Sequence, residues 1–214
     1  MSTASKTHWE KVYESKKYED ATWYQEKPET SLEMIEAMEL PETAGIIDIG
    51  GGDSNLVDYL MQEGYRDISV LDISEKALDH ARDRLGEKAE QVSWIVADAA
   101  SFEPEKMYHL WHDRAAFHFL TEKEKVEGYI SNLERAVKRG GYVVLATFSE
   151  NGPTKCSGRE IRQYSKEELG ALLEEKSEIL ECRNVDHITP SGGKQNFTFC
   201  SFRKKIEDYE RFLG

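Results

Sequence analysis

The sequence predicts an α/β protein built on a doubly wound, mostly parallel sheet. Three observations lead to this fold class. Short apolar runs alternate with segments of helical periodicity, three consecutive glycines follow the first apolar run, and an acidic residue ends each of the next two runs. Strands separated by helices pair in parallel through right-handed crossovers, and ligands bind at the carboxyl ends of such strands.

The elements are assigned in order from hydrophobic spacing and helix-start signals. After a polar start, a helix enters through Pro28 and Thr30 and places Leu32, Ile35 and Met38 on one face. The predicted elements are the helix Pro28 to Leu40, the strand Gly45 to Ile49, the helix Ser54 to Glu63, the strand Ile68 to Leu71, the helix Ser74 to Leu85, the strands Val92 to Val96 and Met107 to Trp111, the helix Glu122 to Lys138 and the strand Tyr142 to Thr147.

The pattern changes towards the C-terminus. Gly140 and Gly141 are expected to stop the long helix before the fifth strand. A further helix then precedes strands at Glu178 to His187 and Gln195 to Phe202, which the turn-rich segment TPSGGK joins. These two strands are predicted to form an antiparallel hairpin rather than another crossover. The last residues, Ile206 to Gly214, are expected to form a short surface helix.

The glycine run indicates a ligand site. Gly50, Gly51 and Gly52 can adopt backbone angles closed to other residues, and they leave no Cβ between the main chain and a ligand. Asp48 lies inside the preceding strand, where a carboxylate is costly without a partner. An acidic residue about 20 positions beyond a glycine loop suits a pair of ribose hydroxyls, and Asp72 is such a residue. The sequence therefore predicts a nucleoside site.

A third acid and the glycine spacing indicate which nucleoside binds. Asp98 follows the third strand, at the same edge of the predicted sheet. A dinucleotide loop would carry a further glycine at the position of Asn55. A buried acid two residues before the first glycine also repels a phosphate and favours a cationic group. S-adenosylmethionine carries an ammonium and a sulfonium and fits these features.

The glycine loop, with Asp72 followed by Ile73 and Asp98 followed by Ala99, resembles that of the class I, seven-stranded S-adenosylmethionine-dependent methyltransferases. The resemblance covers about residues 20 to 203. It implies a Rossmann-like sheet of strand order 3-2-1-4-5-7-6. It also implies a single methyltransferase domain, divided into an N-terminal lid and helix at 1–40, a core at 45–203 and a tail at 204–214.

The resemblance assigns roles at the cofactor. The loop would wrap the amino acid moiety, with Asp48 at its ammonium end. Asp72 would accept hydrogen bonds from both ribose hydroxyls, Asp98 would contact the adenine amino group, and Ala99 would donate from its backbone. The cofactor-binding residues implied are Trp23, Tyr24, Asp48, Gly50, Gly51, Gly52, Ser54, Asp72, Ile73, Asp98, Ala99, His112 and Arg114.

The segment after the fourth strand, WHDRAAFH, stands beside the glycine loop, where a methyl group would be presented. His112, Asp113, His118 and, in the terminal hairpin, His187 are candidate catalytic bases for an acceptor that arrives protonated. The alternative is a local ion pair between Asp113 and Arg114, with the histidines in structural roles. No spacing of Cys, His or carboxylates indicates a metal site.

Aromatic residues upstream of the first strand are predicted to cover the cleft. Trp23 and Tyr24, with Trp9 and Tyr13 further out, could exclude water and contact the cationic sulfonium. The alternative is that these rings only attach the N-terminal helix to the sheet.

The acceptor is expected to be a small molecule. The chain adds little to the core fold except the lid and the loop Phe148 to Gly158, and short additions enclose pockets more readily than they build docking surfaces. The N/D-P-P-Y/F signature that marks methylation of nucleic acid bases in this family is absent after the fourth strand. A protein lysine methyltransferase is an alternative function, because the Trp23-Tyr24-Gln25 stretch resembles a stretch at a similar place in some lysine methyltransferases of this fold. Two further alternatives are a noncatalytic nucleotide-binding protein and, less favoured, an NAD oxidoreductase.

Composition narrows the partners and the compartment. The formal net charge is −13 over 214 residues, which argues against DNA or RNA because nucleic-acid affinity comes largely from Lys and Arg. Cys156, Cys182 and Cys200 are widely spaced without a C-x-x-C pair, so no disulfide framework is expected. No apolar stretch could serve as a signal peptide or a membrane span. A soluble, cytoplasmic protein without a membrane partner is expected.

Overall fold

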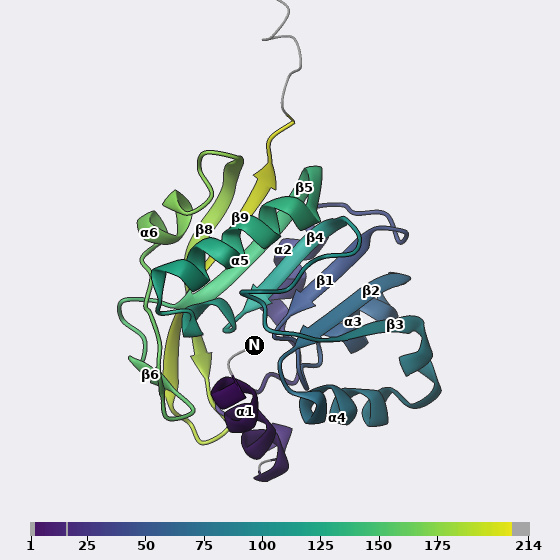
Figure 1. Cartoon of the computed structure of the whole chain (residues 1–214), viewed down its shortest axis with the longest axis vertical. Helices are drawn as coiled ribbons and strands as arrows, with labels where there is room; N and C mark the ends of the chain where they lie inside the picture. The colour runs from purple at the N-terminus through teal and green to yellow at the C-terminus, as the bar shows by residue number, and fades with distance from the viewer. Residues whose placement is uncertain (1–2, 16, 207–214) are drawn as a thin grey trace, which may run out of the picture.

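The computed structural model describes residues 3–15 and 17–206, and its centre is a seven-stranded sheet of order β3-β2-β1-β4-β5-β9-β8 (Figure 1). The strands of this sheet are β1 (Gly45–Ile49), β2 (Asp67–Asp72), β3 (Val92–Val96), β4 (Tyr108–Arg114), β5 (Val137–Phe148), β8 (Ser177–Ile188) and β9 (Lys194–Lys204). Neighbours among β1 to β5 pair in parallel, whereas β9 is antiparallel to both β5 and β8. The predicted fold class, strand order and terminal hairpin are confirmed.

Helices cover both faces of the sheet. The helical segments are α1 (Thr3–Ser15), η1 (Tyr18–Asp20), α2 (Glu29–Glu36), α3 (Leu56–Gln62), α4 (Glu75–Leu85), η2 (Gly86–Gln91), η3 (Phe117–Phe119), α5 (Lys123–Ala136) and α6 (Lys166–Ala171). Buried side chains of α2, α3 and α4 join one apolar cluster, and those of α5 and α6 join the other. Figure 1 shows α5 in front of the sheet and α2 with α3 behind it. The helix α1 and the small hairpin of β6 (Lys155–Cys156) and β7 (Arg159–Glu160) were not predicted as separate elements.

Strand alternation separates the two clusters and so positions the site. In β1, Ile46 packs in the cluster beneath α2 and α3, whereas Ile47 and Ile49 pack in the cluster beneath α5. Successive side chains of a strand point to opposite faces, so Asp48 shares the face of Ile46. Apolar burial on both faces is what a parallel sheet covered by helices requires.

The helix after β2 begins where its sequence predicts. The Ser74 hydroxyl accepts a hydrogen bond from the Ala77 amide at 3.2 Å, which caps α4. Ser165 and Glu168 form a capping box at the start of α6, with hydrogen bonds of 2.9 and 3.1 Å. The first of these caps follows the end of β2 directly, beside the glycine loop.

The strand β4 is longer than predicted. The predicted strand ends at Trp111, but pairing continues through Asp113 with β1 and through Arg114 with β5. Burying His112 and Asp113 in the sheet is possible because both side chains have hydrogen-bond partners there. Alternation along this extension places His112 and Arg114 on the face of Asp48, and Asp113 on the other.

The glycine pair does not stop the long helix, which corrects that prediction. The helix α5 ends at Ala136, and β5 begins at the next residue. Gly140, with φ of +71°, and Gly141 lie inside β5, where the register with β4 shifts between Tyr108 and Leu110. The glycines therefore form an irregularity in the strand, as glycine often does at a bulge.

Cysteine pairing corrects a second expectation. Cys182 and Cys200 are partners across β8 and β9, and they form a disulfide although 18 positions separate them in sequence. Their spacing in the chain did not indicate this contact, because only strand pairing brings the two residues together. The cysteine pattern therefore does not support the cytoplasmic location that the sequence analysis expects.

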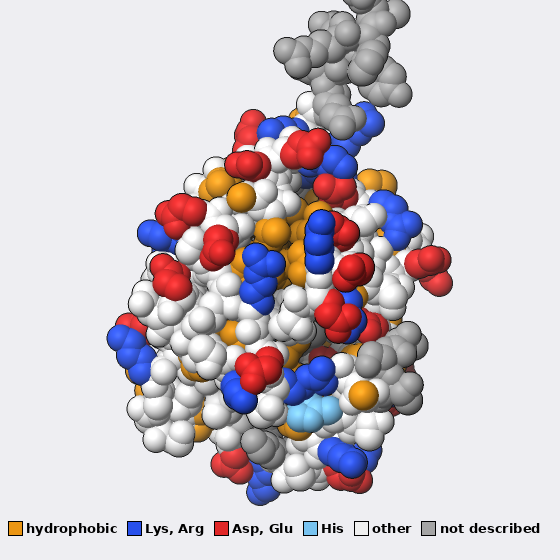
Figure 2. Space-filling view, turned by 60° about the vertical axis from the view of Figure 1, so that its left-hand side comes forward, with side chains coloured by type: hydrophobic (Ala, Val, Ile, Leu, Met, Phe, Trp, Pro, Cys, Tyr) orange, Lys and Arg blue, Asp and Glu red, His pale blue; other side chains and the backbone are white. Residues whose placement is uncertain are grey.

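The surface carries charges of both signs. On the face that Figure 2 turns forward, basic and acidic side chains are interspersed rather than gathered into one stripe. No helix in residues 3–15 and 17–206 combines the length and apolar character needed to cross a membrane. The predicted surface helix at Ile206 to Gly214 falls almost entirely outside the described part of the chain.

Candidate active site

A cleft opens at the carboxyl ends of β1 to β4, and α1 covers part of it. Its free volume, which includes the open mouth, is about 1310 Å³. The lining comes from the N-terminal segment, from the turns after β1, β2, β3 and β4, and from the hairpin of β6 and β7. This is the edge at which parallel α/β sheets bind ligands.

The glycine loop follows β1 closely. The amides of Gly50 and Gly51 donate to the carbonyl oxygen of Leu71 at 2.7 and 3.2 Å. Gly52 has a φ of +44°, a conformation that side chains disfavour. A Cβ on Gly51 would lie 2.5 Å from Oδ2 of Asp48, so no larger residue fits there. The loop thus presents bare backbone to the cleft.

Asp48 has the partner that its burial requires. The Nδ1 of His112 donates to Oδ1 of Asp48 at 2.7 Å, and Nε2 lies 2.9 Å from the hydroxyl oxygen of Ser31. All three side chains are buried and line the cleft. Because the carboxylate accepts from Nδ1, a neutral His112 keeps Nε2 as an acceptor for the Ser31 hydroxyl.

Asp72 ends β2 with one carboxylate oxygen bonded and the other beside the glycine loop. Its Oδ1 accepts from the Ser74 amide at 2.8 Å, and its Oδ2 lies 2.9 Å from where a Cβ on Gly52 would stand. Burial, reinforced by the charge of Asp48, raises the pKa of Asp72 to about 7, although the Ser74 amide opposes the shift. Hydroxyl donors would stabilise the charged carboxylate, so Asp72 suits the ribose diol that the sequence predicts.

The turn after β3 supplies the third acid. Asp98 lines the cleft, and its Oδ1 accepts from the Ala100 amide at 3.0 Å. The carbonyl of Ala99 accepts from Asn132 of α5 at 3.3 Å, which holds the turn in place. Asp48, Asp72 and Asp98 therefore lie at the ends of three adjacent strands, as the sequence predicts.

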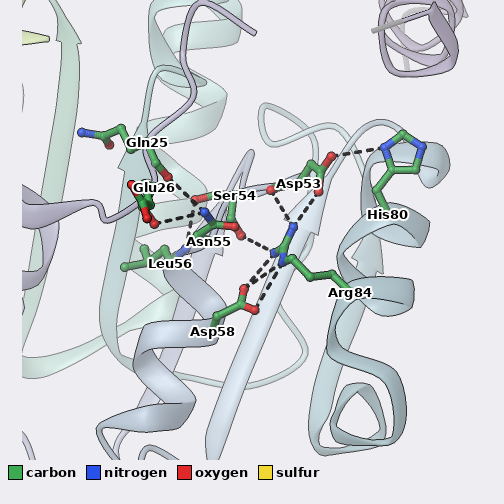
Figure 3. Close-up of polar contacts among 9 residues, drawn as sticks. All are labelled: Gln25, Glu26, Asp53, Ser54, Asn55, Leu56, Asp58, His80 and Arg84. Atoms are coloured by element: carbon green, nitrogen blue, oxygen red, sulfur yellow. Dashed lines mark hydrogen bonds and ion pairs between the residues drawn. The ribbon is translucent and has the colours of Figure 1, made fainter. Parts of the chain in front are cut away.

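Asn55, where a dinucleotide loop would have glycine, connects the loop to the N-terminal segment (Figure 3). Its Nδ2 donates to the carbonyl oxygens of Gln25 and Glu26 at 3.1 Å each. This contact places the segment that contains Trp23 beside the start of α3. The Asn55 side chain therefore has a structural role, because a glycine at this position could not donate these hydrogen bonds.

Arg84 of α4 holds the other side of the same turn (Figure 3). Its Nη1 donates to Oδ1 of Asp53 at 2.7 Å and its Nη2 donates to the carbonyl of Ser54 at 2.8 Å. Asp58 accepts from Nη2 at 2.8 Å, and His80 lies 3.2 Å from Oδ2 of Asp53. The loop is thus fixed between α3 and α4 before any ligand binds.

Aromatic rings cover part of the cleft, and α1 supplies two of them. Trp9 contacts Phe119 edge to face, with ring centroids 5.0 Å apart, and Tyr13 contacts Trp23 at 6.2 Å. These four side chains line the cleft. Glu10 holds α1 in place, because its carboxylate accepts from the backbone amides of Glu75 and Lys76, at the start of α4, at 2.9 and 3.3 Å.

Most of the predicted cofactor residues meet in this cleft. Those that line it are Trp23, Asp48, Gly50, Gly51, Ser54, Asp72, Ile73, Asp98, Ala99, His112 and Arg114. Tyr24 does not line it, and its ring instead packs against Tyr18, with centroids 4.8 Å apart. Tyr18 itself reaches the cleft, as do Ser31 and Cys156, and the sequence signals missed a role for Tyr18 and Ser31. Gly52 shapes the loop without lining the space.

Of the four predicted bases, only His112 lines the cleft. Asp113 is buried on the opposite face, where Oδ1 accepts from the amides of Ala116 and Phe117 and Oδ2 accepts from the Tyr129 hydroxyl at 2.7 Å. Burial raises the pKa of Asp113 to about 6. Asp113 does not pair with Arg114, because alternation along β4 separates their side chains.

The other two histidines have structural contacts. The Nδ1 of His118 accepts from the Phe148 amide at 3.3 Å, within the core. The Nε2 of His187 donates to the carbonyl oxygen of Thr22 at 2.9 Å, which fastens the N-terminal segment to β8. Burial and the charge of Arg114 lower the pKa of both histidines.

His118 should make the protein sensitive to acid. Its pKa falls from 6.5 to about 3 on folding. Below pH 6.5 the unfolded chain takes up a proton that the folded chain does not, so stability is lost as pH falls towards 3, by up to about 1.4 kcal/mol per pH unit. The variant His118→Asn keeps an acceptor for the Phe148 amide and should lose less stability over this window. Urea unfolding at about pH 7 and about pH 4.5 measures the difference; equal losses in both proteins would contradict the assignment.

Comparisons with known proteins agree on one family. Residues 46–141 match a family model described as a methyltransferase domain. Malonyl-[acyl-carrier protein] O-methyltransferase 2 of Ilyobacter polytropus is 28% identical over 111 residues, which cover 51% of this chain and 41% of that protein. The eEF1A lysine and N-terminal methyltransferase of Mus musculus is 26% identical over 155 residues, covering 68% and 22%. This chain thus matches less than half the length of either relative.

A solved structure extends the match to nearly the whole chain. The N-methyltransferase NodS from Bradyrhizobium japonicum, in complex with S-adenosyl-L-homocysteine, superposes with a TM-score of 0.68 at 15% identity, covering 92% of this chain and 98% of that one. At this identity the likeness concerns the fold.

Proposed function

The chain belongs to the class I S-adenosylmethionine-dependent methyltransferases, and we propose that it transfers the methyl group of S-adenosylmethionine to a small-molecule acceptor. The observation that carries the proposal is the aromatic cover. Trp9 and Tyr13 of α1 meet Trp23 and Phe119 over part of the cleft, and this partial cover narrows the acceptor space, which favours a small molecule over a protein surface.

The residues of the cleft fit the cofactor. When bound, S-adenosylmethionine supplies a methyl group already activated on a sulfonium. Asp72 would hold the ribose, Asp98 and Ala99 the adenine, and Asp48 with the glycine loop the amino acid end. Three carboxylates around one loop favour a cationic ligand. The bare backbone of Gly51 allows the close approach that the ligand needs.

The protein's contribution is then chiefly alignment and exclusion of water. The contact between Glu10 and the start of α4 keeps the aromatic cover over the reacting groups. For an acceptor that arrives protonated, we propose His112 as the base: Asp48 holds its Nδ1 proton, and Nε2 would take the acceptor's proton once the acceptor replaces the Ser31 hydroxyl there.

A protein lysine methyltransferase is the second candidate. The relatives that methylate eEF1A favour it, with 22–26% identity over 68–81% of this chain. An acidic surface could attract a basic substrate protein. Against it stands the partial cover of the cleft by α1, because Trp9 and Trp23 narrow the approach of a protein surface to the cleft.

The experiment that separates the candidates uses methyl-labelled S-adenosylmethionine. The purified protein is incubated with this cofactor and a size-fractionated cell extract, and label is followed into small molecules or macromolecules. We expect label in the small-molecule fraction, and no label with the cofactor-site variant Asp72→Ala. Label on a protein band that disappears in that variant would overturn the small-molecule proposal. The same assay with His112→Asn tests the base, because full turnover would exclude it.

A further inference from the structure

Arg114 is a charged side chain in the cleft that forms no ion pair with any residue that the structure describes. Its Nη1 donates to the carbonyl oxygen of Trp23 at 3.1 Å, and its guanidinium lies over the Phe197 ring, 4.8 Å from the centroid. Its Nε and Nη2 are buried and have no hydrogen-bond partner within residues 3–15 and 17–206. Burial lowers the pKa of Arg114 only to about 10, so the side chain stays protonated at neutral pH. Unpaired buried donors on a charged group are costly, and a ligand anion would remove that cost.

The unpaired atoms are the two that form one fork of the guanidinium. The N–H groups of Nε and Nη2 point in the same direction, and together they match the two oxygens of a carboxylate or phosphate. The remaining nitrogen is already bonded to the Trp23 carbonyl, which holds the plane of the group. Arg114 is therefore oriented for bidentate recognition of an anion before a ligand arrives.

The position of Arg114 in the sheet separates it from the nucleoside. Asp48 lies in β1, Asp72 ends β2 and Asp98 follows β3, and these three strands form one half of the cleft edge. Arg114 ends β4 and faces Phe197 of β9, on the other half. A second cation, Arg159 of β7, also lines the cleft. The three acids thus lie where the cationic cofactor is expected, and the two arginines lie beyond it.

We propose that the fork of Arg114 binds an anionic group of the methyl acceptor, so that the substrate is a small molecule with a carboxylate or a phosphate. This inference rests on the proposed function. Arg114 then fixes the acceptor's orientation, with the Phe197 ring beneath the guanidinium and the Trp23 carbonyl holding its far end. The competing assignment is that the same fork holds the carboxylate of the cofactor's own amino acid end.

The first test needs no knowledge of the acceptor. Protein saturated with S-adenosylhomocysteine, which supplies its own carboxylate, is titrated with inorganic phosphate or acetate, and the melting temperature is followed. We expect a rise in the wild type, and at least tenfold weaker anion binding in Arg114→Gln. Arg114→Lys keeps the charge but loses the fork, so it should bind with intermediate strength. The matched control is Arg162→Gln, which removes a guanidinium over the Tyr164 ring and should respond like the wild type.

The outcomes distinguish the two assignments. Equal protection of the wild type and Arg114→Gln, or no protection of the wild type, would overturn the proposal. A tenfold loss of S-adenosylhomocysteine affinity in both Arg114 variants, measured by calorimetry, would assign the fork to the cofactor instead. The Lys variant covers the case in which Arg114→Gln fails to fold.

A second test separates this inference from the proposed function. Small molecules labelled by the wild-type protein are passed over an anion-exchange resin. We expect the labelled product to be retained and its formation to fall at least tenfold in Arg114→Gln. If the labelled product is not retained, the protein still methylates a small molecule, but that acceptor is neutral or cationic. This result would overturn only the proposal that the acceptor is an anion. Label confined to macromolecules would overturn the small-molecule function itself.

Discussion

Replacing Asp72 with alanine is expected to weaken the binding of S-adenosylmethionine by an order of magnitude or more. The carboxylate is buried at the end of β2, and its Oδ2 is directed towards the glycine loop. Each charge-assisted hydrogen bond to a ribose hydroxyl contributes about 1.5–3 kcal/mol, and the variant loses both. Calorimetry with S-adenosylmethionine and S-adenosylhomocysteine measures the change.

The matched control is Asp67→Ala, at the opposite end of the same strand. Asp67 pairs with Lys106 on the surface and lies away from the cleft, so its loss should leave cofactor affinity unchanged. Unchanged affinity in Asp72→Ala would remove the ribose assignment. Binding of NAD in place of S-adenosylmethionine would support the oxidoreductase alternative.

Stability distinguishes lost binding from lost folding. The pKa of Asp72 rises from 3.8 to about 7 on folding. Between these values the folded chain holds a proton that the unfolded chain has released, so the contribution of Asp72 to stability falls as pH rises through this window. Above pH 7 the buried, ionised carboxylate therefore lowers the stability of the cofactor-free protein. The isosteric variant Asp72→Asn keeps an acceptor for the Ser74 amide and removes the buried charge. Above pH 7 it should unfold at a higher urea concentration than the wild type, even though it binds cofactor poorly.

Replacing Asp113 with alanine is expected to destabilise the fold by on the order of 3–5 kcal/mol. Its carboxylate accepts hydrogen bonds from the amides of Ala116 and Phe117 and from the Tyr129 hydroxyl, all within the core. Removing the acceptor leaves these buried donors unpaired, at about 1–3 kcal/mol each. Urea unfolding at neutral pH measures the loss.

The variant Asp113→Asn separates a structural role from a catalytic one. Its amide oxygen can still accept from the Ala116 and Phe117 amides, and it removes a buried charge whose pKa is raised to about 6. We expect Asp113→Asn to fold and to keep methyl transfer in the labelling assay. A folded Asp113→Asn protein without turnover would instead restore Asp113 as a catalytic base.

The sequence by itself determined the order of the seven sheet strands and of α2 to α6 along the chain, the glycine loop and the three acids near strand ends. These features depend on short-range properties, namely hydrophobic periodicity, backbone freedom at glycine and the capping of helices by nearby side chains. Strands β1 and β3 have the predicted bounds, and Ser74 caps α4 where its sequence indicates. The cofactor class follows from the same local pattern.

Only the tertiary structure decided which polar residues share the cleft. Ser31 is 81 positions from His112, and Trp23 is 91 positions from Arg114, yet each pair is in hydrogen-bond contact. Likewise, the extension of β4 assigned Asp113 to the core and Arg114 to the cleft, although they are neighbours in sequence. The physical reason is that a buried polar group is stable wherever a partner reaches it, and the partner is chosen by strand pairing and helix packing rather than by sequence distance.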